Sequence, residues 1–241
     1  MLNMLIAFAC SALTSAVMMR FVSGNIWIVM SVSAVVFIAV FFLITRSIMK
    51  KVTDLMQIAQ RDVMANRSDK AIRELKDGMK YGAWQFYVKQ QIYSQIGTIH
   101  YIKREFNEAI PFLEKGFVRN WVSMSMLAIA YMKKNKTGKM IETFDKAVSG
   151  SRKEPMVYAL YAFCLDRVGE RGKAQAILKK GLSKTGEDER LKENLELLEA
   201  GKKMKMKGFG DMWYQFHLEK QGAIIKKQTK AMTGRRKQVL R

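Results

Sequence analysis

Residues 156–182, MVYALYAFCLDRVGERGKAQAILKKGL, predict two helices joined by a tight turn. Small or large apolar residues recur in this stretch at spacings of 7, 5, 4 and 3, at Ala162, Gly169, Ala174, Leu178 and Gly181. Small side chains allow two helix axes to approach closely, and Gly169 suits the turn between them. The stretch therefore predicts a closely packed helical hairpin.

Three upstream stretches carry similar sets of residues. They are Ala128, Tyr131, Phe144 and Ala147; Gly97, Ala109, Leu113 and Gly116; and Ala59, Ala71, Leu75 and Gly78. The pattern resembles the tetratricopeptide repeat (TPR), a helix-turn-helix unit of about 34 residues. The resemblance implies an all-α fold, with a TPR-like α-solenoid of about four helix pairs over residues 49–201. Residues 187–200, apolar on one face and charged on the other, are expected to form its capping helix.

In TPR proteins the first helix of each pair lines a concave face. Carried onto this chain, that face implies a protein-binding groove containing Tyr101, Met132, Lys133, Phe163 and Arg167. Such a groove is apolar with two basic points, which suits an amphipathic helix or an extended peptide carrying acidic residues. Two alternatives stay open: some of these side chains pack between repeats, or the chain fills the groove with its own residues 213–216.

The N-terminal region contains two uncharged apolar runs. Residues 2–19 and 26–45 each have about the length that a helix needs to cross a bilayer, and a short link joins them. We therefore expect a transmembrane helical hairpin over residues 1–48, with the second helix continuing into the amphipathic pattern that begins at Val52. A signal peptide is disfavoured because no basic segment precedes the first run.

The basic residues that flank the hairpin predict its orientation. Arg46, Lys50, Lys51 and Arg61 follow the second run, whereas Arg20 alone lies in the link. By the positive-inside rule, we expect both termini and the helical domain to lie on the cytoplasmic side. The membrane itself is expected to be a bacterial-type inner membrane. This layout is similar to that of the TPR subunit of Pel-type exopolysaccharide synthase complexes.

The C-terminal region, residues 202–241, is basic and contains aromatic residues. The whole chain has a formal charge of +21, and residues 201–241 contain twelve Lys or Arg and two acids. Trp213 and Phe216 are three residues apart, so a short helix presents both on one side. Beyond them, anionic lipid or nucleic acid is expected to contact Lys226, Lys227, Arg235 and Arg236. The first interpretation of the tail is that it is solvated and contacts no partner. Among partners, lipid is preferred to nucleic acid because the anchor holds the tail near a membrane.

We found no pattern that indicates catalysis, a metal site or a cofactor. The two histidines lie far apart, and no phosphate-binding loop is present. His100 takes the place of a core aromatic residue in its repeat, and Cys164 lies in an apolar helix. The sequence therefore predicts a non-catalytic, membrane-anchored scaffold that binds protein partners. The alternatives are a membrane tether for nucleic acid or ribosomes, and a regulator that contacts a membrane enzyme through its hairpin.

Overall fold

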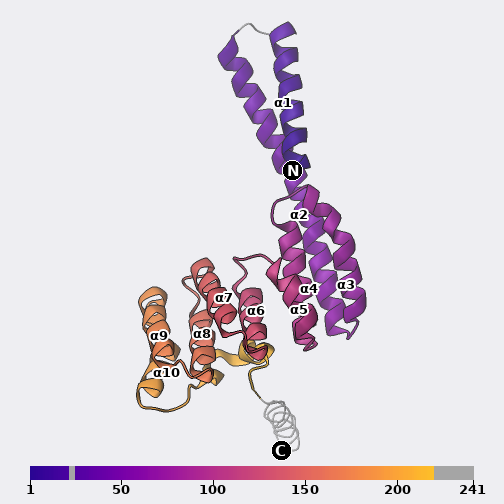
Figure 1. The fold of residues 1–241 in the computed structure, drawn as a ribbon. Coiled ribbons are helices and arrows are strands. Elements are labelled where there is room, and N and C mark those ends of the chain that lie inside the picture. The colour runs from indigo at the N-terminus through magenta and orange to yellow at the C-terminus, as the bar shows by residue number, and fades with distance from the viewer. Residues whose placement is uncertain (22–24, 220–241) are drawn as a thin grey trace, which may run out of the picture. The chain divides into compact units, whose positions relative to one another are not determined.

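The computed structural model describes residues 1–21 and 25–219, and these residues form helices and no strand (Figure 1). The helices of the first 102 residues are α1 (Leu2–Phe21), α2 (Ile26–Met64), α3 (Ser68–Asp77), the 3-10 helix η1 (Gly78–Ala83) and α4 (Val88–Ile102). They are followed by α5 (Phe106–Glu114), α6 (Trp121–Lys133), α7 (Thr137–Gly150), α8 (Pro155–Arg167), α9 (Arg171–Thr185), α10 (Glu189–Glu199) and the 3-10 helix η2 (Met206–Phe216).

These helices divide into two compact units. The first contains residues 1–99 with Lys115–Phe117, and the second contains His100–Glu114 and the chain from Val118 onward. The boundary between the units falls within residues 49–201.

In the first unit, polar contacts join α1 to α2. The Ser15 and Ser33 hydroxyl oxygens are 2.7 Å apart, and the Ser11 hydroxyl donates to the carbonyl of Ser33 at 3.0 Å. Nearer the chain start, Asn3 donates to the hydroxyl of Thr45 at 3.1 Å. Small hydroxyl-bearing residues let two apolar helices approach each other while their polar atoms are satisfied.

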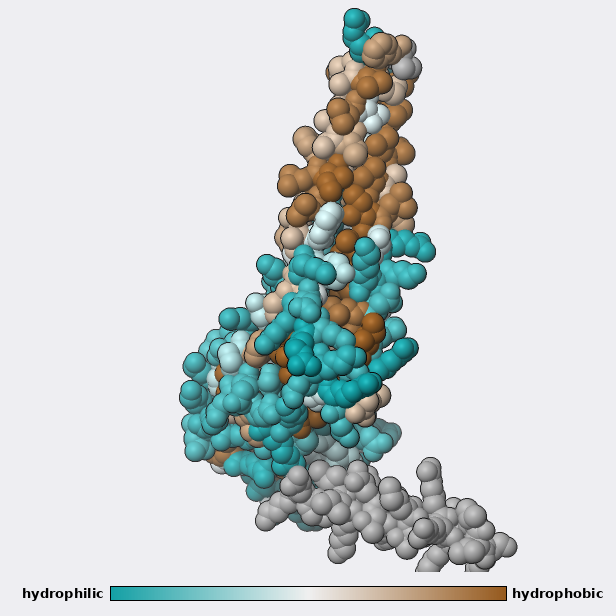
Figure 2. Space-filling model, turned by 90° about the vertical axis from the view of Figure 1, so that its right-hand side faces the viewer, coloured by the Kyte–Doolittle hydropathy of each residue, from teal (hydrophilic) through white to brown (hydrophobic). Residues whose placement is uncertain are grey.

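The outward surface of this hairpin is apolar. Leu5, Phe8 and Val35 are each about two-thirds exposed, at 69%, 68% and 66%. Figure 2 shows hydrophobic side chains gathered over α1 and the first part of α2. By length and composition both helices could span a membrane.

Beyond its apolar part, α2 continues without a break to Met64, as the amphipathic pattern from Val52 predicted. Val52 and Ala59 are buried there, as are Ala71 and Leu75 of α3. The buried carboxylate of Asp62 pairs with Arg67 and Lys70 at 2.8 and 3.1 Å. These two ion pairs compensate the negative charge that Asp62 buries.

In the second unit, consecutive helices form hairpins: α6 packs on α7, α8 on α9, and α9 on α10. Gly181 of α9 shows why a small residue is needed at this packing position. A Cβ atom there would lie 2.8 Å from Cγ of Tyr158 in α8 and 3.0 Å from Leu191 in α10. Any larger side chain would push these three helices apart.

Four helix-helix turns share one backbone geometry. The turns place Asn66, Arg104, Asn135 and Gly169 in the left-handed region, with φ between 57° and 90°. In each turn the next residue donates its N–H to the carbonyl five residues earlier, at 2.8 or 2.9 Å. This bond ends the first helix and redirects the chain into the second.

Two details of the sequence-based prediction differ from the structure. The sequence predicts a helix over residues 105–118, but α5 ends at Glu114. The N–H of Phe117 instead donates to the hydroxyl of Ser94 at 2.7 Å. The contact links residues of the first unit, to which Lys115–Phe117 belongs. His100 is only partly buried: it stacks on Phe112 and forms a 2.7 Å bond with Glu105.

Candidate functional site

The segment after α10 folds back within the second unit and lies against the helices of that unit. We call residues 206–219 the return segment; it comprises η2 and the three residues that follow (yellow in Figure 1). Gly210, with φ of 69° and ψ of −151°, interrupts the helical geometry and redirects the segment. Phe209, Trp213 and Phe216 are 8%, 1% and 0% exposed, so the segment completes the core of this unit.

Three consecutive carbonyl groups of the return segment each accept a hydrogen bond from a different helix. Tyr101 of α4 donates its hydroxyl to the carbonyl of Phe216 at 2.7 Å. Lys133 of α6 donates to the carbonyl of His217 at 3.1 Å, and Arg167 of α8 donates to the carbonyl of Leu218 at 2.9 Å. These contacts recognise main-chain atoms and are therefore independent of the side chains at positions 216–218.

Aromatic contacts hold the side chains of the same segment. The Trp213 ring meets the ring of Phe163 edge-on, with centroids 4.9 Å apart. Phe216 stacks on Trp121 at 6.3 Å, and the Trp213 indole N–H donates to Glu219 at 2.9 Å. Both large rings are thus buried with the one polar atom of Trp213 satisfied.

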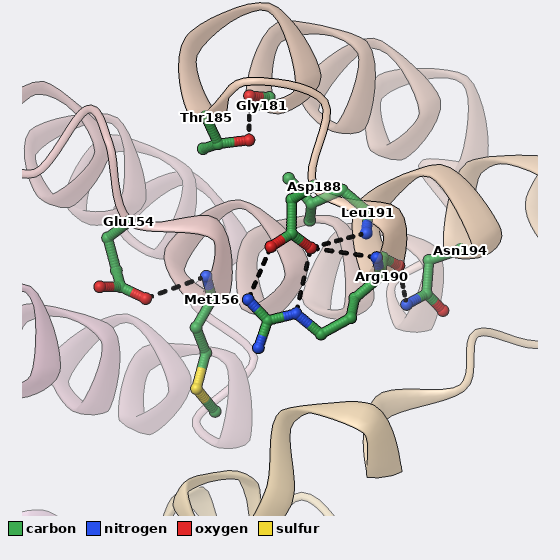
Figure 3. A network of polar contacts seen from close by, with 8 residues as sticks. All are labelled: Glu154, Met156, Gly181, Thr185, Asp188, Arg190, Leu191 and Asn194. Carbon is green, nitrogen blue, oxygen red and sulfur yellow. Dashed lines mark hydrogen bonds and ion pairs between the residues drawn. The ribbon is translucent and has the colours of Figure 1, made fainter.

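A polar network at the start of α10 positions the entry to the return segment (Figure 3). Asp188 accepts from the backbone N–H groups of Arg190 and Leu191, and its two carboxylate oxygens also bind the Arg190 guanidinium at 3.1 and 2.6 Å. The guanidinium lies 4.6 Å from the centroid of the Phe209 ring. Asn194 accepts from the N–H of Lys205 at 2.7 Å and donates to the carbonyl of the same residue at 3.3 Å.

Next to the return segment lies a cavity of about 430 Å³ with a strongly basic lining. Arg104 comes from the turn after α4, Lys133 from the end of α6 and Arg167 from the end of α8, and residues 217–219 supply another wall. Burial, followed by the nearby Arg167 and Arg104 charges, lowers the pKa of Lys133. Burial and then Arg104 likewise lower the pKa of His217, whose ring nitrogens lie 3.2 Å from the carbonyl of Ile102 and 3.4 Å from Arg104.

The structure brings the five groove residues predicted from the sequence together around the return segment. Tyr101 is fully buried, whereas Met132 and Phe163 are partly buried. The alternative in which the chain fills this face with its own residues is confirmed for Trp213 and Phe216. Lys226, Lys227, Arg235 and Arg236 lie outside the described residues.

Three contributors were missed by sequence reasoning. Arg104 was missed because its proximity to His217 joins residues 113 positions apart. Trp121 was missed because the sequence predicts this helix to begin at residue 122, whereas Asn120 caps it and Trp121 is its first residue. The pairing of Asp188 with Arg190 was missed because both residues lie in the charged stretch 187–200, which was predicted only to form the capping helix of the solenoid.

Among residues 1–21 and 25–219, no group of three or more His, Cys, Asp or Glu side chains could hold a metal ion. Burial raises the pKa of the Cys164 thiol well above its ordinary value, so this cysteine stays protonated at neutral pH. No protein-family model matches the chain, and no curated protein matches its sequence.

Proposed function

We propose that this protein is a membrane-anchored, non-catalytic adaptor whose TPR-like helix pairs bind a peptide segment of a protein partner. The observation that supports the proposal is the set of three consecutive carbonyl bonds from Tyr101, Lys133 and Arg167 to the return segment. A face that holds three successive main-chain carbonyls and two aromatic side chains has the chemistry of a peptide-binding groove. The partner segment, in this proposal, competes with the return segment for that face.

The four turns of common geometry favour the TPR-like arrangement. The apolar hairpin favours an anchor in a bacterial-type inner membrane. Basic residues are in excess in α2 beyond its apolar part, and this excess favours a cytoplasmic location for the helical units. Attachment to a membrane raises the local concentration of the adaptor for partners in the same membrane. An envelope or exopolysaccharide assembly is one setting that such an adaptor suits.

A photo-crosslinking amino acid at Met132 tests the peptide-binding face in the full-length protein in its own membranes. We expect partner adducts from this position and not from the matched position Lys146, an exposed residue of α7. An added peptide of residues 206–219 should compete and reduce the Met132 adducts several-fold. Equal adducts at both positions, or adducts that the peptide leaves unchanged, would contradict the proposal.

Protease protection in sealed inside-out membrane vesicles tests the proposed topology. With the helical units on the cytoplasmic side, added protease digests the chain beyond α2 in intact vesicles. Protection of that region until detergent is added would place it on the opposite side.

A further inference from the structure

The cavity beside the return segment concentrates positive charge that its lining offsets only in part. Arg104, Lys133 and Arg167 line it, together with the amide-bearing Asn135. Glu219 is the one carboxylate of the lining, and it keeps its charge while it accepts from the neutral Trp213 indole. Asp166, next to Arg167 in the chain, pairs with Arg171 at 3.2 Å. The sequence of residues 220–241 contains eight Lys or Arg and no Asp or Glu, so it offers no acidic side chain to balance the cluster.

The three cations keep hydrogen-bond donors for a ligand. Lys133 donates one hydrogen bond to the carbonyl of His217, and Arg167 donates one to the carbonyl of Leu218. An ammonium has three N–H donors and a guanidinium has five. Lys133 and Arg167 line the same cavity, and Arg104, which also lines it, lies beside His217.

We propose that this cavity is a binding site for a phosphate group. A tetrahedral phosphate presents several oxygens in different directions and carries up to two charges, which suits donors that approach from three elements; a carboxylate has only two coplanar oxygens. A bound phosphate relieves the repulsion among the three cations and links the ends of α4, α6 and α8 to the return segment. Lys133 and Arg167 also hold the return segment in the peptide-binding proposal, so the phosphate site is the state of this face with the return segment in place. Phosphate titration reports the phosphate site, and crosslinking at Met132 reports peptide binding, so the two proposals can fail separately.

The chemistry is shared by two sources, a soluble phosphate ester and the headgroup of a phosphatidic-acid-type lipid. Both leave a terminal phosphate accessible to the cavity. The two sources are distinguished by the concentration at which each protects the site.

Lysine footprinting of the full-length protein in uncharged detergent micelles tests the site without any substitution. Inorganic phosphate and soluble dihexanoyl phosphatidic acid are the probes, with chloride at equal ionic strength as the reference. We expect saturating phosphate to slow acetylation of Lys133 about tenfold. Lys134 and Lys136, which are exposed like Lys133 but do not line the cavity, should react at unchanged rates. Stronger protection by the lipid assigns the site to a headgroup, and stronger protection by the inorganic anion assigns it to a soluble ester.

Matched charge-removing variants provide the second measurement, by calorimetric titration of phosphate. The variant Lys133→Gln/Arg167→Gln should bind phosphate at least tenfold more weakly, whereas Lys134→Gln/Lys136→Gln, which loses the same charge, should bind within twofold of the unmodified protein. Equal weakening in both variants, or uniform protection of all three lysines, would show general attraction to a basic protein and overturn the proposal.

Discussion

His217 links the charge of the basic cavity to the stability of the second unit. Its folded-state pKa lies below the ordinary value of 6.5, because burial and the neighbouring Arg104 disfavour the protonated ring. The unfolded chain therefore binds more protons than the folded one as the pH falls past 6.5. The stability contribution of the neutral ring is complete above pH 6.5 and is lost as the pH falls through the lowered pKa.

We expect the full-length protein in uncharged micelles to lose stability between about pH 7.5 and about pH 5. The measurement is the denaturant midpoint followed by tryptophan fluorescence. The variant His217→Gln, which has no titrating ring, should show a smaller loss over the same interval. An identical pH dependence in both proteins would remove His217 as the cause.

Asp188 is the residue on which the start of α10 depends. The substitution Asp188→Ala removes the acceptor for two backbone N–H groups and the partner of Arg190, which itself covers Phe209. We expect a loss of about 1–2 kcal/mol in the free energy of unfolding, the range for a helix cap. Denaturant unfolding measures it, with the exposed Glu196→Ala on the same helix as a control that changes stability little.

The turns with a left-handed residue end the first helix of each hairpin and redirect the chain into the second. Gly169, with φ of 90°, has no atom within 4 Å of the position that a Cβ would take, so a substitution there changes backbone strain alone. We expect Gly169→Ala to destabilise the protein by about 1–2 kcal/mol. The matched variant Gly172→Ala, equally free of contacts but helical, should stabilise it by up to about 1 kcal/mol. Equal effects on thermal unfolding would contradict this explanation.

Helices with a regular apolar spacing were predictable, and their placement against distant segments was not. The spacing of Ala162, Gly169 and Gly181 located α8, its turn and α9 closely, because local periodicity and close packing are both encoded within one hairpin. Helix α5 ended early because residues 115–117 pack with residues of the first unit. That outcome depends on tertiary contacts, which override local helix propensity.

The candidate site shows the same division. The register of the hairpins was enough to group Tyr101, Lys133 and Arg167 on one face. Their bonds to residues 216–218 depend on the course of the chain after α10, which Gly210 redirects and which no short-range pattern specifies. The aromatic pair Trp213 and Phe216 was the one local signal of that return.

At the scale of the whole molecule, the return segment determines whether the second unit has a complete core. Trp213→Ala leaves a large void against Phe163, and we expect it to cost about 3–5 kcal/mol. The matched Met212→Ala, at a position that is 48% exposed, should change stability by less than about 0.5 kcal/mol. Both values come from denaturant unfolding of the full-length protein in micelles, and comparable losses would show that the return segment is not part of the core.

The position of the return segment in the chain also has a consequence for biosynthesis. Chains are made from the N-terminus, so in the topology proposed above α1 and α2 reach the bilayer while the later helices are still being translated. The rings of Phe163 and Trp121 have their cover only after residues 213–216 have left the ribosome. Until then the apolar face of the nascent protein is open, and in the proposed function this is the interval in which a chaperone or a partner segment meets that face without competition from the return segment.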